Sequence, residues 1–600
     1  MAAKAKLGAK ATSSSNTKPG PKAKPASNSK QSPKAKPASN SKQSPKAKPG
    51  LNSKQGKPSY PDLRDHIRNL KKKGLLRTVD IPINKDTEMH PLVRWQYRGG
   101  VPEKDRGAFL FTNVHGQDGK KYDMPVIVGA MAASAEVYAT GLGCKREEIA
   151  SLWTRAMANP IAPKVVRNAP CQEVIIEGKD LKKAGCGVDA FPIPISTPGY
   201  DNAPYITMSF YATKDPDTGV QNLGCYRAQV KARDRVGLNM SLESGKDGHA
   251  HWLKWKKLGK KMPAAIVLGG PPCVLYVGGM KVPQGVDELT IAGGLVGKPL
   301  NVVRARTVDL LVPAEAEIVI EGYVNTEYLE PEAPFGESHG LVNLQEYNCY
   351  MDVTCITRRK DAIFMNYINQ LAPSESSVRS RVTMEGLYLK ELRAMQIGGL
   401  KNVVFHEALT GSRRIIFLLF ARDALDTEVW RGLTAAAMLK KGTGKIVFAL
   451  SDDIDPENLD AVMWSMAFRF KPHLDLKVHE NWAAGHGPRD IVRGDADSAL
   501  LINAVLKHDM APVALPKREY MERAREIWEK DLGWAPLKPE TPWFGYSLGA
   551  WTEQLEKEAI RAVKGEHWET GRIAAKRRRK DIAMNTEVRF VDDSDKGKAD

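Results

Sequence analysis

The sequence predicts a multidomain protein of the mixed α/β (α+β) class, with a strand-rich middle domain between two domains in which helices and strands alternate. The chain has 600 residues, of which 42% are hydrophobic, and this is enough for several separate cores. Helix-like and strand-like segments alternate near both ends, whereas residues 186–350 carry dense strand signals punctuated by Gly and Pro. We therefore expect α/β domains at 59–185 and 351–580 around a central β-barrel domain at 186–350.

Residues 1–58 differ in composition from the rest of the chain. They repeat a twelve-residue unit, PKAKPASNSKQS, and contain fourteen lysines, no acidic residue and almost no large apolar side chain. Such a segment buries too little apolar surface to offset the entropy cost of ordering, so we predict a disordered tail. Without the tail the net charge falls from +19 to +5. The near-neutral remainder gives no electrostatic reason to expect a specific nucleic-acid partner.

The first α/β domain has two kinds of pattern. DLRDHIRNLKKKG carries apolar residues at helical spacing, and Gly74 ends it as a stop signal. MPVIVGAM at 124–131 and CQEVIIEG at 171–178 are typical of strands, and EEIASLWTRAMA at 147–158 is typical of an amphipathic helix. This alternation predicts strands covered by helices.

The middle and C-terminal domains follow from the same signals. Segments such as YITMSFYATKD, AAIVLGG and EIVIEGYV predict the strands of the middle domain. Farther along, KIVFAL reads as a strand followed by an acidic turn, where Asp455 is expected to cap a helix with Pro456 at its first position. The last residues, 581–600, are expected to form a flexible tail.

Several classes of protein are disfavoured. No run approaches the roughly 18 apolar residues of a membrane span, and no apolar segment follows the first lysines as in a secretory signal. The seven cysteines include no CxxC pair and read as reduced packing residues. The expected compartment is the cytoplasm.

Two segments of the middle domain place polar residues beside glycines. In NLGCYRAQ at 222–229, Asn222 and Arg227 would share one face of a strand only if the chain bends at Gly224. In GGMKVPQGVDE at 278–288, the glycines allow backbone amides to approach a ligand phosphate or ring, and Glu288 falls in the first turn of a helix. An arginine in a salt bridge and a glutamate that only complements a helix dipole are the alternatives.

A third segment, EPEAPFGESHG at 330–340, sets Glu332 and Glu337 five residues apart around apolar residues. Two carboxyl groups held close together in such a loop would have pKa values pushed apart, as general acid–base catalysis requires. An acidic surface loop is the alternative. His249 and His251 are either metal ligands or ordinary polar residues.

In this order, NLGCYRAQ, AAIVLGGPPCVLYVGGMKVPQGVDE, EIVIEGYV, PEAPFGESHG and SDDIDPENLDAVMW resemble the run of motifs in the UbiD family of decarboxylases, which depend on prenylated flavin mononucleotide (prenylated FMN). The similarity covers roughly residues 60–500. It implies a central split-barrel domain that binds the flavin between α/β domains.

The resemblance also implies site residues. The catalytic trio matches Arg227, Glu332 and Glu337. The cofactor would be contacted by Asn222, Leu223, Gly224, Cys225, Arg227, Gly278, Gly279, Met280 and Glu288. A divalent metal, usually manganese, and often potassium would bind near the phosphate, with Asn222 and Glu288 as metal ligands. A histidine usually supplies the third ligand, but ungapped spacing reaches Gly245, so His249 is the candidate, with His251 or Lys246 as alternatives.

The implied reaction is the reversible, non-oxidative decarboxylation of an aromatic or α,β-unsaturated carboxylic acid. Loss of carbon dioxide leaves an electron pair on carbon, which requires an electron sink that no ordinary side chain supplies. Arg227 would orient the departing carboxylate and keep Glu332 ionised, and Glu337 would protonate the carbon.

Two other functions remain open: an aryl-CoA decarboxylase or carboxylase subunit, and a polyanion-binding protein that acts through the basic tail. Expected partners are a UbiX-type flavin prenyltransferase that supplies the cofactor, and further copies of the chain in a homodimer or hexamer.

Overall fold

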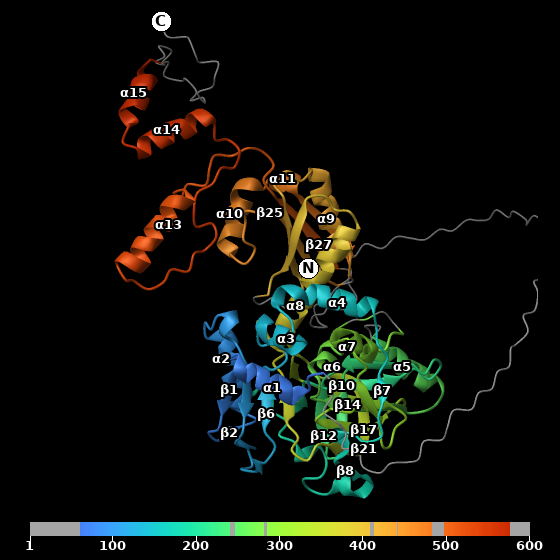
Figure 1. Cartoon of the computed structure of the whole chain (residues 1–600). Helices are drawn as coiled ribbons and strands as arrows, with labels where there is room; N and C mark the ends of the chain where they lie inside the picture. Colours follow the sequence, from blue (N-terminus) through green and yellow to red (C-terminus); the bar gives the residue numbers. More distant parts are fainter. Residues whose placement is uncertain are drawn as a thin grey trace, which may run out of the picture. The chain divides into compact units, whose positions relative to one another are not determined.

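A computed structural model describes residues 60–240, 246–280, 282, 285–407, 413–440, 442–482 and 497–576 (Figure 1). The contacts divide the chain into residues 1–56 and 57–600, and the elements below belong to the second unit. The predicted tails at 1–58 and 581–600 lie outside the described residues.

The first described helix, α1 (Leu63–Lys72), begins where the sequence predicts. The Asp62 side chain accepts a hydrogen bond from the Asp65 amide in a capping box, and Leu63 and Leu70 are buried. The elements that follow are α2 (Met89–Arg98), α3 (Ala135–Leu142) and α4 (Ile149–Ala158), with β2 (Ile83–Asn84), β4 (Val114–His115) and β5 (Lys121–Tyr122) in a small sheet. The expected helix at 147–158 is thus present as α4.

A four-stranded sheet joins the N-terminal segment to a later part of the chain. Its order is β1 (Leu76–Val79), β3 (Ala108–Phe111), β6 (Val126–Val128) and β22 (Phe364–Asn366). Met365 pairs with Ile127 in a parallel register, so β22 returns to this sheet after the central strands. The sheet therefore holds together residues that are far apart in sequence.

The largest sheet has ten strands. The path runs β11 (Gln221–Cys225), β10 (Phe210–Lys214), β14 (Met262–Leu268), β17 (Ile318–Val324), β21 (Glu346–Arg358), β13 (Arg235–Leu238), β12 (Ala228–Ala232) and β9 (Tyr205–Ile206), with β8 (Val174–Glu177) and β18 (Glu330–Glu332) also paired to β21. The end strands β11 and β9 do not pair with each other, so the described strands form no closed barrel. The strand-rich middle domain is confirmed, and the expected barrel is not found as a closed one.

Two helices, α5 (Asp247–Lys257) and α7 (Glu288–Val296), pack beside this sheet, and α6 (Pro272–Val277) packs against α7. Smaller pairings join β7 (Lys164–Val165), β15 (Asn301–Arg304) and β16 (Leu311–Pro313), and β19 (Phe335–Gly336) with β20 (Val342–Asn343). The buried apolar residues of α6 and α7 share one core cluster with those of α3 and α4.

The C-terminal part contains a second α/β unit. Its mixed sheet has the order β23 (Leu400–Phe405), β24 (Ile415–Phe420), β25 (Ile446–Ser451), β27 (Asp497–Ala504) and β26 (Leu476–Trp482), and a core cluster lies on each face. The helices α8 (Glu375–Ala394), α9 (Asp426–Met438), α10 (Leu459–Arg469) and α11 (Pro472–Asp475) accompany it. Strands alternating with helices are thus confirmed here.

The predicted N-cap at Asp455 is wrong by almost one turn. The helix α10 begins at Leu459, and the Asn458 side chain accepts hydrogen bonds from the Asp460 and Ala461 amides. Asp455 instead accepts from the Glu457 amide in a tight turn. Asp455 and Asn458 are both residue types that cap helices, but Asp455 forms the turn before the helix and Asn458 caps the helix.

The remaining helices are α13 (Arg518–Glu526), α14 (Glu553–Val563) and α15 (His567–Ala575). Within the described parts of the chain, no helix has the length and apolar character needed to cross a membrane.

Candidate active site

An arginine and two glutamates from distant parts of the chain meet in one ion-pair cluster. Arg227 Nε donates to Glu332 Oε1 (2.8 Å) and its Nη2 to Glu332 Oε2 (2.7 Å), while Nη1 donates to Glu337 Oε1 (2.9 Å). One guanidinium therefore holds both carboxylates, in a bidentate pair with Glu332 and a single bond to Glu337. The structure brings together the three residues that the sequence singles out.

The position of Arg227 depends on a break between two strands. The strand β11 ends at Cys225 and β12 begins at Ala228, so Tyr226 and Arg227 are not in strand conformation. Side-chain alternation along one strand therefore does not apply to Arg227. The sequence predicts a bend at Gly224, and the structure has the break two residues later, at Tyr226 and Arg227.

The loop that carries the two glutamates is held by aromatic contacts. The guanidinium of Arg227 lies 4.9 Å from the centroid of the Phe335 ring, which packs against Tyr205 at 4.4 Å. The Tyr205 hydroxyl accepts a hydrogen bond from the Ala333 amide (3.1 Å). Ala333 has a φ of 77°, a left-handed conformation that is strained for a residue with a Cβ. These contacts hold a strained turn between Glu332 and Glu337.

The two carboxylates have different surroundings. Glu332 is fully buried, and its Oε2 also accepts from the side-chain amides of Asn239 and Asn348 (3.3 Å each). Burial opposes the charge of Arg227, but the charges of Glu332 and Glu337 outweigh it and raise the arginine pKa. Glu332 is thus held by several donors away from the cavity. Glu337 accepts from one guanidinium nitrogen and from the Ser338 amide (3.1 Å), and it lines a cavity, which places it better than Glu332 to exchange a proton with a ligand.

The two glycine-containing motifs lie against each other beside this cluster. The Cys225 amide donates to the Gly278 carbonyl (3.0 Å). A Cβ on Gly278 would lie 2.4 Å from the Phe210 ring, and one on Gly279 would lie 1.8 Å from Nη1 of Arg379. The backbone here admits no side chain. Three other residues expected to contact the cofactor pack into or against the hydrophobic core cluster that includes α6 and α7: Leu223, Cys225 and Met280.

Arg379, on α8, is a site residue that sequence reasoning missed. Its Nη1 is buried and has no hydrogen-bond partner among the described residues. A buried guanidinium nitrogen without a partner is costly unless a ligand acceptor completes it. No local signal marks this arginine, because α8 lies far along the chain and only the tertiary fold brings it to Gly279.

Glu288 and Asn222 form a second polar group near the glycines. Glu288 begins α7, is 3% exposed, and accepts a hydrogen bond from the Leu223 amide at 2.8 Å. Burial raises the pKa of Glu288 to about 8, and the charges of Asp287 and Asp247 act in the same direction. Asn222 is buried on the adjacent strand β11. A carboxyl and a carboxamide oxygen are donors that a hard divalent cation accepts.

The structure does not identify the third ligand that the sequence leads us to expect for a metal. Gly245 lies outside the described residues. His249 stacks on Trp252 in α5, with ring centroids 6.1 Å apart, and the ring of His251 is hydrogen-bonded to Thr213 (3.0 Å). The described residues contain no cluster of three His, Cys, Asp or Glu side chains able to hold a metal. Metal ligation by His249 therefore remains a prediction.

The start of α5 nevertheless reaches this group. The Gly248 amide donates to the Tyr226 hydroxyl (3.3 Å), and Nζ of Lys246 lies 5.5 Å from the centroid of the Tyr226 ring. The charge of Asp247 raises the pKa values of both Glu288 and Tyr226, which places it near both. Asp247 is a further acidic residue at this position that the sequence did not single out.

A cavity of about 330 Å³ opens beside Glu337. Its wall combines residues 196–200, the loop 336–342, and residues 370–371, with Pro91 and Arg94 of α2. A cavity of this size next to an acid–arginine cluster suits a small ligand of about one ring.

Comparison with known proteins gives the family. Three family models, described as the N-terminal, Rift-related and C-terminal domains of 3-octaprenyl-4-hydroxybenzoate carboxy-lyase (UbiD), match residues 67–157, 164–370 and 382–485. The models follow one another in the order of the chain and include the site residues above except Leu371 and Arg379, which lie between the second and third models.

The chain is also similar to individual proteins over most of its length. An uncharacterized protein of Aquifex aeolicus is 29% identical over 511 residues, which cover 78% of this chain and 98% of the relative. The UbiD-class enzyme HmfF from Pelotomaculum thermopropionicum, solved in complex with FMN, is 26% identical with a TM-score of 0.65 and covers 74% of this chain and 94% of its own. Vanillic acid decarboxylase of Sedimentibacter hydroxybenzoicus shares the fold, with 24% identity, a TM-score of 0.64 and coverage of 78% and 99%. The chain belongs to the UbiD family of carboxy-lyases.

Proposed function

We propose that the protein catalyses the non-oxidative decarboxylation of an aromatic or α,β-unsaturated carboxylic acid with prenylated FMN, and that the reaction is reversible. The observation that carries this proposal is the cluster of Arg227, Glu332 and Glu337 beside a cavity of about 330 Å³. HmfF is described as a UbiD-class enzyme and has also been solved in a complex with prenylated FMN, at 26% identity to this chain.

The residues present fit a flavin cofactor. A Cβ on Gly224 would lie 2.5 Å from the Tyr226 ring, and the positions of Gly278 and Gly279 are equally crowded. The glycines thereby let the side chains of Tyr226, Phe210 and Arg379 pack directly against the backbone of these motifs. The unpartnered Nη1 of Arg379 offers a positive donor to an anionic or carbonyl group. When bound, the prenylated flavin supplies the electron sink that decarboxylation requires.

A divalent metal, which we expect to be manganese, would be held by Asn222 and Glu288, with His249 as a further candidate and potassium nearby. The support is the carboxyl of Glu288, which lies buried beside Asn222 and whose pKa is raised by burial. A bound cation would favour the carboxylate form and release its proton.

The remaining roles follow from the geometry. Arg227 would bind the substrate carboxylate and orient its bond to the carbon, while Glu332 keeps the guanidinium fixed and charged. When that carbon–carbon bond breaks, carbon dioxide leaves and the electron pair stays with the substrate. Glu337 would then deliver its proton to the carbon. The size of the cavity favours a free acid of about one ring over an aryl-CoA thioester.

Partners and location stay proposals as well. We expect a UbiX-type prenyltransferase to supply the cofactor and the protein to act in the cytoplasm. We also expect a homodimer or a hexamer, and one HmfF structure is described as an evolved dimeric form. Polyanion binding would depend on residues 1–58, which lie outside the described residues.

The test is turnover by protein co-expressed with such a prenyltransferase, with the cofactor content read from its absorbance spectrum and mass. Glu337→Gln should abolish carbon dioxide release and exchange of deuterium into the product while the cofactor content stays unchanged. Glu330→Gln is the matched control, because Glu330 lies on β18, close in sequence to Glu337, but pairs with Lys231 and Arg235 outside the cluster. Full turnover by Glu337→Gln would exclude Glu337 as the proton donor. If the co-expressed wild-type protein contains no prenylated FMN, the proposed cofactor would be excluded.

A further inference from the structure

The cavity beside Glu337 contains buried polar groups that the protein itself does not satisfy. Gln370 is 7% exposed, and neither its Oε1 nor its Nε2 has a hydrogen-bond partner among the described residues. Ser196 is 5% exposed, and its hydroxyl is likewise without a partner in the described part of the chain. Both residues line the cavity.

The backbone around these groups is fixed. One carboxylate, that of Asp201, accepts hydrogen bonds from the amides of Ser196 (3.1 Å), Thr197 (2.7 Å) and Gly336 (2.9 Å). It thereby ties the wall that carries Ser196 to the loop that carries Glu337.

The opposite wall is fixed as well. Arg94 donates to the carbonyls of Leu371 (2.6 Å) and Pro373 (3.2 Å), which anchors the segment that follows Gln370. A Cβ on Gly336 would lie 3.2 Å from Cγ of Gln370, so the glutamine side chain packs closely on that loop. Gln370 is therefore held in the cavity wall by fixed neighbours on both sides.

Leaving such groups unpaired is costly. A buried donor or acceptor without a partner has lost its hydrogen bonds to water, so a ligand that completes the hydrogen bonds recovers that cost on binding. The carboxamide of Gln370 offers both a donor and an acceptor, and the hydroxyl of Ser196 offers both as well.

The chemistry of the ligand group follows from this pairing. A hydroxyl group donates one hydrogen bond and also accepts, so it can donate to Oε1 of Gln370 while it accepts from the Ser196 hydroxyl, or donate to Ser196 while it accepts from Nε2 of Gln370. A methoxy group or a carboxylate only accepts, and a methyl group does neither. On the basis of the proposed function, we propose that Gln370 and Ser196 determine specificity by binding a hydroxyl substituent on the ring of the acid whose carboxylate meets Arg227.

The experiment measures binding without turnover. Holoenzyme carrying Glu337→Gln is titrated by calorimetry with benzoic acid, the three monohydroxybenzoic acids and their methoxy counterparts. We expect one hydroxy acid to bind at least about tenfold more tightly than its methoxy counterpart and the parent acid. Adding Gln370→Met, a substitution of similar length, should reduce that preference to within about threefold, and Ser196→Ala should weaken it in part. Gln172→Met, outside the cavity, should leave it unchanged.

A second readout uses the protein without substrate. Because Gln370→Met removes an unpaired buried amide, it should leave the Tm of the holoenzyme unchanged or raise it. A fall of several degrees would mean that the amide is satisfied within the protein, and would overturn the proposal. So would equal binding of all the acids, or a preference that survives Gln370→Met. Loss of the preference in Gln370→Met together with an absence of turnover in the wild type would sustain this proposal and refute the proposed reaction.

Discussion

At the scale of single residues, the buried carboxylates of the site differ in the groups that donate hydrogen bonds to them. Glu332 is held by Arg227 and two carboxamides, whereas Asp201 accepts three backbone amides with no arginine or lysine bonded to it among the described contacts. Burial raises the pKa of Asp201 to about 6, and the amide hydrogen bonds only partly oppose that rise. Asp201 therefore titrates in a range where activity and stability are readily measured.

This shift predicts a specific pH dependence. The carboxyl of Asp201 in the unfolded chain has its ordinary pKa, so between that value and about 6 the folded protein binds more protons than the unfolded chain. The contribution of Asp201 to stability should fall as the pH rises through this range and level off above it. We expect Asp201→Asn to remove this slope, as measured by Tm from pH 4.5 to 7.5. Identical pH profiles for the two proteins would show that Asp201 has an ordinary pKa.

The sequence identified Arg227, Glu332 and Glu337 because their residue types and spacing match a known chemistry. It missed Arg379, Asp201 and Gln370 because their roles come from contacts between distant segments, such as Gly279 with Arg379. Metal ligation by His249 stays a prediction, because ungapped spacing reaches Gly245 and the structure shows only that the His249 ring lies against Trp252.

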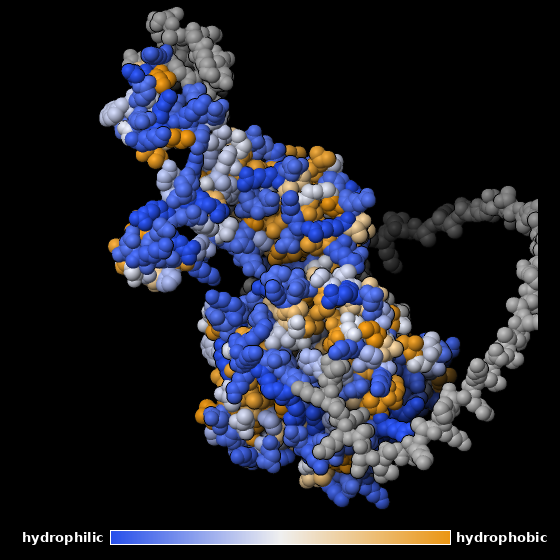
Figure 2. Space-filling model, viewed as in Figure 1, coloured by the Kyte–Doolittle hydropathy of each residue, from blue (hydrophilic) through white to orange (hydrophobic). Residues whose placement is uncertain are grey.

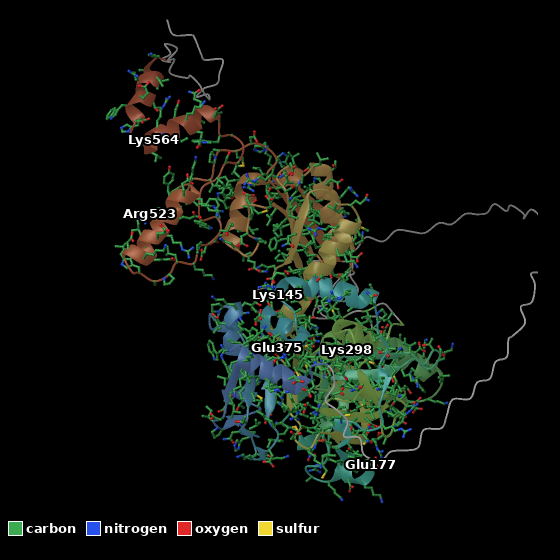
Figure 3. The ribbon with its side chains drawn as sticks, viewed as in Figure 1. Lys145, Glu177, Lys298, Glu375, Arg523 and Lys564 are labelled. Carbon is green, nitrogen blue, oxygen red and sulfur yellow. The ribbon has the colours of Figure 1, made fainter. Side chains whose placement is uncertain are left out.

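At the scale of elements, the start of α8 organises the interior of the site. Ser374 caps the helix, and the carboxylate of Glu375 accepts amide hydrogen bonds from Gly129, Met131, Ala132 and Ile368. Figure 3 labels Glu375 in the interior, near the beginning of α8. One side chain thus joins the ends of β6 and β22 to the helix that carries Arg379.

Replacing Glu375 by Gln should therefore destabilise the protein. The amide nitrogen of glutamine cannot accept, so part of the four-amide cluster would lose its acceptor, and we expect a loss of about 2 kcal/mol in the free energy of unfolding. Urea denaturation measures this change, and cofactor retention should fall with it because α8 positions Arg379. Glu391→Gln is the matched control, because Glu391 is exposed near the other end of α8. Equal stability of the two variants would contradict this role of Glu375.

Helix boundaries show what local patterns can determine. The starts of α1 and α7 follow from the sequence, because a single aspartate precedes each helix and caps it: Asp62 for α1 and Asp287 for α7. The start of α10 does not, because Asp455 and Asn458 are both capable caps and only one begins the helix.

At the scale of the whole molecule, the sequence predicts the α/β class and a strand-rich middle, but not which strands pair. The pairings of β22 with β6 and of β8 with β21 join segments that are separated by long stretches of chain. Periodicity identifies strands but not their partners, which is also why the sequence predicts a barrel where the structure has an open ten-stranded sheet.

The last helices differ from the rest of the described chain. No residue of α13, α14 or α15 is buried, yet α14 exposes Ile560 (43%) and Val563 (62%), and Trp568 on α15 is 79% exposed. Figure 2 shows hydrophobic patches among the hydrophilic surface of these helices. Amphipathic helices gain most of their stability by burying the apolar face, so these faces are expected to pack against another surface. A second copy of the chain is the occupant that the expected homo-oligomer supplies.

This argument predicts the outcome of a mass measurement on the full chain. Wild-type protein should sediment as a dimer or larger assembly of the 66.1 kDa chain, and the double variant Val563→Ser, Trp568→Ser should shift toward the monomer because the association loses buried apolar area. Ile81→Ser is the matched control, since Ile81 is 63% exposed in the N-terminal part and should leave the mass unchanged. A monomeric wild type, or a double variant with the wild-type mass, would show that these helices do not hold the assembly together. Retained turnover in a monomeric variant would further show that Arg227, Glu332 and Glu337 act within one chain.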